Sequence, residues 1–158
     1  MRFIALLAVV FLSGCAIFSD SEEDLFCPEV GLIPYTDTVS LVSASAVING
    51  FTGSCSFKKG SGVEIDLTLP FVARKKDNTG AQVVKLPYFI AVLSPDETIL
   101  QRKAFSTTVS FDENGSGGST EEQTVTIPMT SAAEAYKYKV VMGFALTPEQ
   151  LKYNKEKK

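Results

Sequence analysis

Residues 63–71 alternate between apolar and polar side chains. The apolar members are Val63, Ile65, Leu67, Leu69 and Phe71, and between them stand Glu64, Asp66, Thr68 and Pro70. A period of two is typical of an antiparallel β-strand with one face in the core and the other in water. Pro70 has no N–H to donate to a neighbouring strand, so we expect a sheet edge or a bulge at this position.

Six further segments have strand character, with turns between them. They cover residues 46–51, 54–57, 86–93, 99–111, 124–128 and 136–146. Short strands separated by turns are typical of sandwiches. We therefore predict an all-β fold, a single antiparallel β-sandwich of immunoglobulin or fibronectin type with about seven strands. The last strand resembles the penultimate strand of such domains, where an opening tyrosine, here Tyr136, caps a corner.

The chain is predicted to end in a short helix. Thr147 has the properties of an N-cap, Pro148 suits the first helical position, and Gln150 is placed to complete a capping box. About two turns of helix need tertiary contacts to persist. We expect Leu151 and Tyr153 to pack back on the sheet.

A short hydrophobic run opens the sequence. Arg2 precedes apolar residues 3–12, and the run ends in the tetrad Leu12-Ser13-Gly14-Cys15. A bilayer span needs about 20 apolar residues, so this segment is typical of a secretory signal peptide. The tetrad resembles a bacterial lipobox. That resemblance implies removal of residues 1–14, a diacylglyceryl group on the Cys15 thiol and an acylated new amino terminus. The alternative is an ordinary cleaved signal peptide that contains a cysteine.

Residues 15–26 are interpreted as a lipidated acidic tether, and residues 27–158 as the sandwich domain. The tether carries four acidic residues and no basic ones. As a flexible coil, its eleven residues after Cys15 would span about 18 Å on average. Ala16 follows the anchor cysteine, where aspartate is an inner-membrane retention signal in many Gram-negative bacteria, and it thus resembles an outer-membrane-sorted lipoprotein.

The chain has three cysteines. With Cys15 lipidated, Cys27 and Cys55 remain, and an even pair in an oxidising compartment indicates a disulfide. Such a bridge would attach the end of the tether to a strand of the domain. The alternative is two free thiols in a nucleophilic or metal-binding role, for which no histidine partner is available.

The composition argues against several classes of function. The chain has no histidine and a net charge of −3, so it lacks the usual general base, the commonest metal ligand and a basic surface for nucleic acid. We expect no catalytic residue, no metal, no small-molecule cofactor and no nucleic-acid partner. The loop at residues 112–120 lacks the glycine position of a calcium loop and the Gly-Lys-Ser/Thr ending of a phosphate loop.

An enzyme acting on envelope polymers stays open as an alternative, because glycosidases need two facing carboxylates. The adjacent acidic pairs that could supply them are Asp96 and Glu97, Asp112 and Glu113, and Glu121 and Glu122. Adjacent carboxylates in turns are more commonly solvated.

Three sequence segments, together with the lipobox and Cys27-Pro28, resemble a family of small envelope lipoproteins of Gram-negative bacteria. They are Gly50-Phe51-Thr52-Gly53-Ser54-Cys55, Leu86-Pro87-Tyr88-Phe89 and Leu146-Thr147-Pro148-Glu149-Gln150-Leu151. The resemblance implies an envelope location and a single compact domain. It carries over no activity and no binding residue.

From these observations we expect a non-catalytic binding or scaffold module that serves outer-membrane assembly or integrity. Its partners would be the membrane, through the lipid anchor, and an envelope protein, and its location the periplasmic face of the outer membrane. The apolar strand at residues 86–93 is a candidate contact surface, with burial in the core as the alternative. A passive structural lipoprotein is a further alternative.

Overall fold

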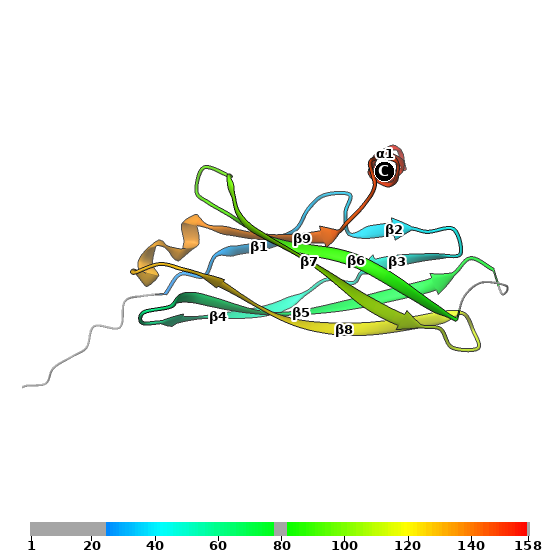
Figure 1. Ribbon diagram of the computed structural model, residues 1–158, viewed down its shortest axis with the longest axis horizontal. Helices are drawn as coiled ribbons and strands as arrows, with labels where there is room; N and C mark the ends of the chain where they lie inside the picture. The colour runs from blue at the N-terminus through cyan, green and yellow to red at the C-terminus, as the bar shows by residue number, and fades with distance from the viewer. Residues whose placement is uncertain (1–24, 78–81, 158) are drawn as a thin grey trace, which may run out of the picture.

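The computed structural model describes residues 25–77 and 82–157, which form two β-sheets packed face to face (Figure 1). Sheet A has the order β1 (Glu29–Leu32), β9 (Lys139–Phe144), β6 (Val83–Leu93) and β7 (Ile99–Ser110). Sheet B has the order β2 (Thr38–Ser40), β3 (Ala44–Ile48), β5 (Gly62–Lys75) and β4 (Thr52–Lys58), and β8 (Ser116–Ile127) also pairs with β5. The predicted all-β sandwich is confirmed, with nine strands in the described residues instead of about seven.

Strand β5 is the central strand of sheet B. One of its edges pairs with β8, and the other pairs first with β4 and then with β3. The backbone N–H of Asn49 donates to the carbonyl of Pro70 at 2.8 Å, so the proline nitrogen faces the break between β3 and β4. Pro70 therefore lies where the partner strand is interrupted and no N–H is required, which confirms the predicted irregularity.

The core lies between the two sheets and has aromatic side chains near its centre. The five apolar residues predicted to share one face of β5 are each at most 2 % exposed. The Phe71 ring from sheet B lies 5.0 Å from the ring of Tyr88 and 5.9 Å from that of Phe144, both of which belong to sheet A. Aromatic contacts of this kind stabilise the packing of the two sheets beyond the contribution of the buried apolar area.

Strand β6 includes the apolar segment that was a candidate contact surface. Its inward side chains Val84, Leu86, Tyr88, Ile90 and Val92 are all buried in the core. On the outer face Phe89 is 9 % exposed, and the Arg102 guanidinium lies 4.4 Å from the centre of its ring. The structure therefore favours the alternative interpretation, in which this strand belongs to the core.

Strand β8 is longer than the predicted segment 124–128, because it begins at Ser116. The inward positions of its first half are Gly117, Ser119, Glu121 and Gln123, so an apolar alternation is missing there. These polar groups have partners. The Thr107 hydroxyl donates to Glu121 at 2.7 Å, and the Gln123 amide donates to the Tyr88 hydroxyl at 3.1 Å. Burial raises the pKa of Tyr88 to about 12, so it is a neutral phenol at physiological pH.

The start of the last strand differs from the prediction. Strand β9 begins at Lys139, and Tyr136 lies in the preceding 3-10 helix η1 (Ala132–Lys137). Ala132 and Ala135 are fully buried, which fixes this turn against the sandwich. Tyr136 is 57 % exposed, with its ring edge-on to that of Phe26 at 6.3 Å. It therefore opens no strand and caps no corner inside the domain.

Strand β1 occupies the edge of sheet A next to β9 and runs parallel to it, although β1 comes first in the chain. In immunoglobulin-like domains this edge is taken by the strand that follows the counterpart of β9. Cys27, just before β1, forms a disulfide with Cys55 of β4, with a Cα–Cα distance of 5.9 Å. The predicted bridge is present, and it ties the first strand of sheet A to sheet B.

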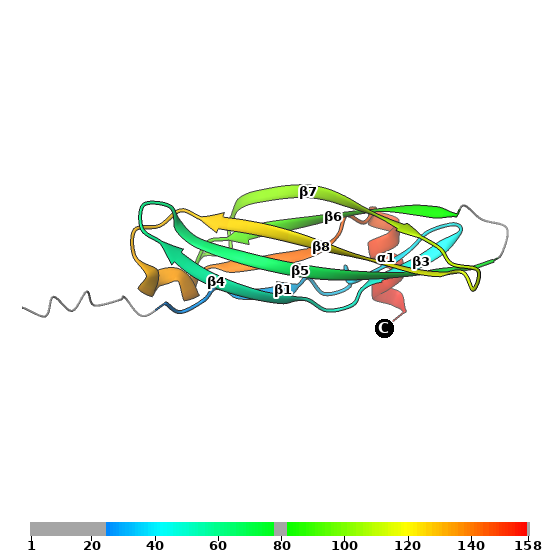
Figure 2. The ribbon, with the colours of Figure 1, turned by 90° about the horizontal axis from the view of Figure 1, so that it is seen from below.

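The sandwich is elongated along its strands, and the chain enters at one end of the long axis (Figures 1 and 2). Helix α1 (Pro148–Glu156) has the predicted capping box between Thr147 and Gln150, but none of its residues is buried. Leu151 is half-buried and Tyr153 is 44 % exposed, so the expected packing on the sheet is weak. Among the residues described, we find no helix with the length and apolarity needed to cross a membrane.

Candidate binding groove

Helix α1 is held to the sandwich by hydrogen bonds to the edge of β2. The Asn154 amide donates to the backbone carbonyls of Tyr35 at 2.8 Å and Thr38 at 2.9 Å. The Gln150 amide donates to the carbonyl of Ser40 at 3.5 Å. Thr38 and Ser40 carry outward carbonyls of an edge strand, which are groups that would otherwise invite pairing with another chain. The helix therefore caps this edge and stands beside sheet B without covering its face.

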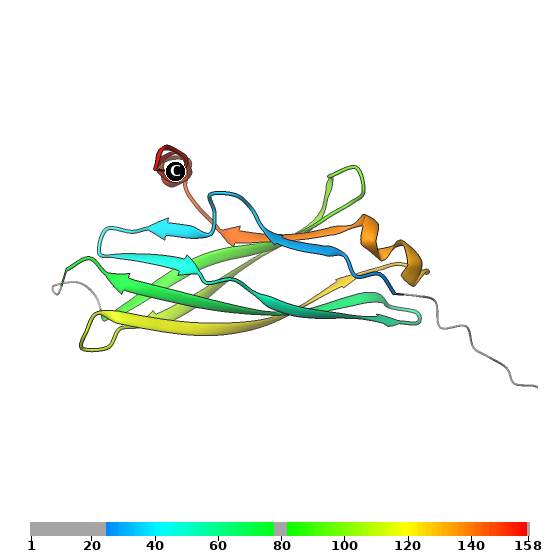
Figure 3. The same ribbon diagram turned by 180° about the vertical axis from the view of Figure 1, so that it is seen from behind.

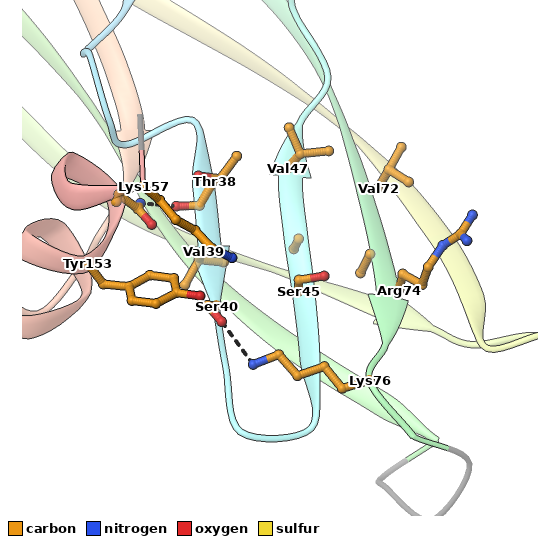
Figure 4. Close-up of a pocket in the computed structure, with 13 residues that line it drawn as sticks. Thr38, Val39, Ser40, Ser45, Val47, Val72, Arg74, Lys76, Tyr153 and Lys157 are labelled. Carbon is orange, nitrogen blue, oxygen red and sulfur yellow. Dashed lines mark hydrogen bonds between the residues drawn. The ribbon is translucent and has the colours of Figure 1, made fainter.

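This placement creates a groove of about 610 Å³ between α1 and the outer face of sheet B (Figure 4). Residues of β2, β3, the end of β5 and α1 line it. They are Thr38, Val39, Ser40, Ser45, Ala46, Val47, Val72, Ala73, Arg74, Lys76, Tyr153, Asn154 and Lys157. It is larger than the hollows of about 270, 230 and 360 Å³ elsewhere in the described part of the chain, and it is open to solvent.

The floor of the groove is apolar. Val47 and Val72 are direct cross-strand partners on β3 and β5, and Val72 is 43 % exposed. On the outer face of β5, Glu64, Asp66 and Thr68 precede Pro70 and Val72, so the row changes from polar to apolar side chains as it reaches the groove. An exposed valine beside a half-buried one provides apolar contact area for a ligand without requiring a deep cavity.

The walls of the groove are basic. Arg74, Lys76 and Lys157 are exposed, and no carboxylate is among the lining residues. The Lys76 ammonium donates to the Ser40 hydroxyl at 2.8 Å and to the Leu41 carbonyl, which holds the side chain across the groove (Figure 4). The Lys157 ammonium lies 4.9 Å from the centre of the Tyr153 ring. A hydrogen bond from Lys157 lowers the pKa of the Tyr153 phenol, with smaller contributions from the charges of Lys157 and Lys76.

A smaller hollow of about 360 Å³ adjoins the groove and shares Ser40, Lys76 and Tyr153 with it. Its lining includes Glu149 and Gln150 from the first turn of α1. The positive charge is therefore strongest toward the end of β5 and the carboxyl end of α1, and it weakens toward the amino end of the helix.

The sequence contains no pattern that connects the segments whose residues line this groove. In the sequence, Arg74 and Lys76 belong to a short charged stretch, and Lys157 belongs to a lysine-rich end of the chain. Val72 was the available signal, because it places an apolar side chain on the polar face of the regular strand. Only the position of α1 beside β2 brings residues 38–47, 72–76 and 153–157 together.

The three acidic pairs do not form facing carboxylates. The Asp96 carboxylate accepts from the Thr98 hydroxyl at 3.1 Å and from the Ser94 hydroxyl, which lowers its pKa, while Glu97 forms an ion pair with Lys139 at 3.1 Å. Asp112 accepts from the backbone N–H groups of Asn114 and Ser116, both at 2.9 Å.

Glu121 and Glu122 are consecutive in β8 and thus point to opposite faces of sheet B. Facing carboxylates are what glycosidase chemistry requires. In the described residues there is also no group of three or more side chains suited to hold a metal ion.

The other predicted site residues lie in different places. Leu12, Ser13, Gly14 and Cys15 lie outside the described residues, so cleavage and lipidation stay predictions. Cys27 and Cys55 form the disulfide and border an apolar hollow of about 230 Å³ with Val30, Phe51 and Ile65. No family model, curated protein or solved structure matches this chain.

The hydrogen bonds that attach α1 to the sandwich lead to a prediction about the local stability of this helix. Asn154→Ala removes the amide bonds to Tyr35 and to Thr38 of β2, while placing a stronger helix former in α1. We expect amides of α1 to exchange with deuterium roughly tenfold faster, because two hydrogen bonds of about 1 kcal/mol each are lost and the higher helix propensity of alanine offsets about 0.6 kcal/mol of that loss. Hydrogen-exchange mass spectrometry measures this, with Lys155→Ala at an exposed position of the same helix as the matched control. Equal exchange in both variants would show that other contacts hold the helix.

Proposed function

We propose that this protein is a membrane-anchored lipoprotein of the cell envelope whose domain is a non-catalytic binding module. The groove between α1 and sheet B is its binding surface. The observation that carries the proposal is the combination of an exposed apolar floor with three cations in a chain of net negative charge. Such a surface suits recognition of another molecule.

The lipobox and the acidic tether support the anchor, and Ala16 supports sorting to the periplasmic face of the outer membrane. The described chain begins at one end of the long axis, whereas α1 lies in the opposite half of the domain (Figure 3). Strand β5 with its 14 residues has a length of about 46 Å at 3.3 Å per residue. An anchor at the tether end would thus leave the groove accessible from the side.

Two measurements test the proposal. An intact mass of the protein from native membranes should equal the chain from Cys15 plus acyl groups, and an unacylated mass would remove the anchor from the proposal. Cross-linking in native membranes should then capture a stoichiometric envelope protein, and Val72→Trp should abolish that product by filling the groove.

The matched control for Val72→Trp is Thr52→Trp. Thr52 is exposed on the same outer face of sheet B and pairs with Thr68, four residues along β5 from the valine. The control variant should keep the cross-linked product. If both variants keep it, the partner binds elsewhere, and if the unmodified protein gives no product, a passive structural lipoprotein is the better account.

A further inference from the structure

We propose that the ligand of the groove is an extended, acidic peptide segment of a partner protein, in which one apolar side chain and two carboxylates follow one another at every second position. This inference rests on the proposed function, since it names the kind of partner that the same groove receives. Three observations support it, namely an arginine with no partner among the described residues, the spacing of Val72 and Arg74 along β5, and the pairing or capping of the strand edges that border the groove.

The first observation is the state of Arg74. Its side chain is exposed and extends from β5 on the side of the groove away from α1 (Figure 4). Within the described part of the chain its guanidinium has no hydrogen bond, ion pair or ring contact. A guanidinium binds carboxylates through two parallel hydrogen bonds. Arg74 is therefore ready to receive an anionic side chain at no cost in broken contacts.

The second observation is periodicity. Val72 and Arg74 stand two positions apart in β5, so their side chains share the outer face at an interval of about 7 Å, and Lys76, in the bend just after the strand, lines the same groove. An extended peptide repeats its own same-face side chains at the same interval. A peptide lying along β5 can thus place an apolar residue on Val72 and carboxylates at Arg74 and Lys76, and Lys157 adds charge from the helix side.

The third observation concerns the way the peptide is held. Strand β5 is paired on both edges, and the outward carbonyls of β2 are occupied by amides of α1. Addition of the peptide as a further strand is therefore blocked at this place. The contacts come from side chains on the face of the sheet, so affinity depends on charge and should fall with rising salt.

A single small anion fits the groove less well, because Arg74 extends on the side away from α1 whereas Lys76 and Lys157 lie toward Tyr153, so the three cations do not converge on one point (Figure 4). An anionic lipid surface is disfavoured by position, since α1, which borders the groove, lies in the half of the domain away from the tether end (Figure 3). Both ligands are nevertheless competitors that the experiment distinguishes.

The test is a binding titration with the mature, acylated full chain in neutral detergent. The probe is the fluorescently labelled peptide Gly-Val-Ser-Glu-Ser-Glu-Gly, measured by anisotropy, and the version with glutamine in place of both glutamates is its control. We expect saturable binding of the acidic peptide that weakens at least tenfold in Arg74→Glu and by less in Arg74→Lys. Binding should also weaken at least tenfold between 50 and 500 mM salt.

The matched protein control is Lys85→Glu, which makes the same kind of charge change at an exposed position of β6 in sheet A. It should leave affinity within twofold. Equal loss in Lys85→Glu and Arg74→Glu would overturn the groove as the site. Equal affinity for the glutamine peptide would overturn the requirement for carboxylates.

Competition experiments identify the chemical class of the ligand. The competitors are millimolar inorganic phosphate and soluble short-chain phosphatidylglycerol. If either displaces the labelled peptide more effectively than unlabelled peptide does, the ligand is a small anion or a lipid and this inference is overturned. If no acidic peptide binds while Val72→Trp still removes the cross-linked partner, the inference fails and the proposed function stands. If Val72→Trp also leaves the partner bound, both fail.

Discussion

Replacing Phe71 with alanine is expected to lower the free energy of unfolding by about 3–5 kcal/mol, the usual cost of removing a buried phenylalanine. The side chain is 1 % exposed, and its ring contacts Tyr88 and Phe144 in the opposite sheet. Its loss would leave a cavity between the sheets and remove two aromatic contacts across the interface. Urea unfolding followed by circular dichroism measures the change.

Two further variants calibrate this result. Phe71→Leu keeps most of the apolar volume and should cost less than half as much. Val72→Ala, on the neighbouring residue, changes a side chain that is 43 % exposed on the outer face and should cost about 1 kcal/mol or less. A loss below about 1.5 kcal/mol for Phe71→Ala would show that the sheets close around the missing ring, contrary to a tightly packed centre.

Removing the disulfide should have the second-largest effect. The bridged cysteines are separated by 28 residues, for which the chain-entropy model gives about 3–4 kcal/mol of stabilisation. The double variant Cys27→Ser with Cys55→Ser should therefore unfold at a clearly lower urea concentration. Reductant should destabilise the unmodified protein to the same level and leave the double variant unchanged.

The disulfide also predicts where the domain loosens first. Strand β1 has four residues and pairs only with β9, and the bridge ties its entrance to β4. Without it, amides of Val30 and Leu32 should exchange faster than those of β5. Ser56→Ala, at an exposed position of β4 next to Cys55, is the control and should change neither stability nor exchange. Uniform loss of protection across both sheets would instead indicate a purely global effect.

Short sequence patterns predicted the fold well where the same few neighbouring residues determine both the backbone conformation and the burial of the side chains. The alternation at residues 63–71 identified the inward face of β5, because a half-buried strand needs that period. The cap at Thr147 and Gln150 is likewise a local hydrogen-bonding unit, so its sequence pattern was sufficient. The cysteine pair followed from counting, on the expectation that Cys15 carries the lipid.

The missed elements lack such a signal. Strand β8 lacks an apolar alternation because its inward positions include Gly117, Glu121 and Gln123. The side chains of Glu121 and Gln123 form hydrogen bonds with Thr107 of β7 and Tyr88 of β6. Strand β1 is short and half-buried, so its parallel pairing with β9 has no local pattern. Tyr136 continues the alternation of the last strand, yet the buried alanines of η1 take it out of the sheet.

The sequence by itself determined the class of fold, the inward face of β5, the helix cap and the pairing of Cys27 with Cys55. Each of these depends on residues that are close in the chain or few enough to count. The tertiary structure decided the strand order and the groove. Arg74, Lys76 and Lys157 become neighbours only because Asn154 hydrogen-bonds α1 to the edge of β2. A contact between residues more than eighty positions apart has no period in the sequence, so only the packed structure could reveal it.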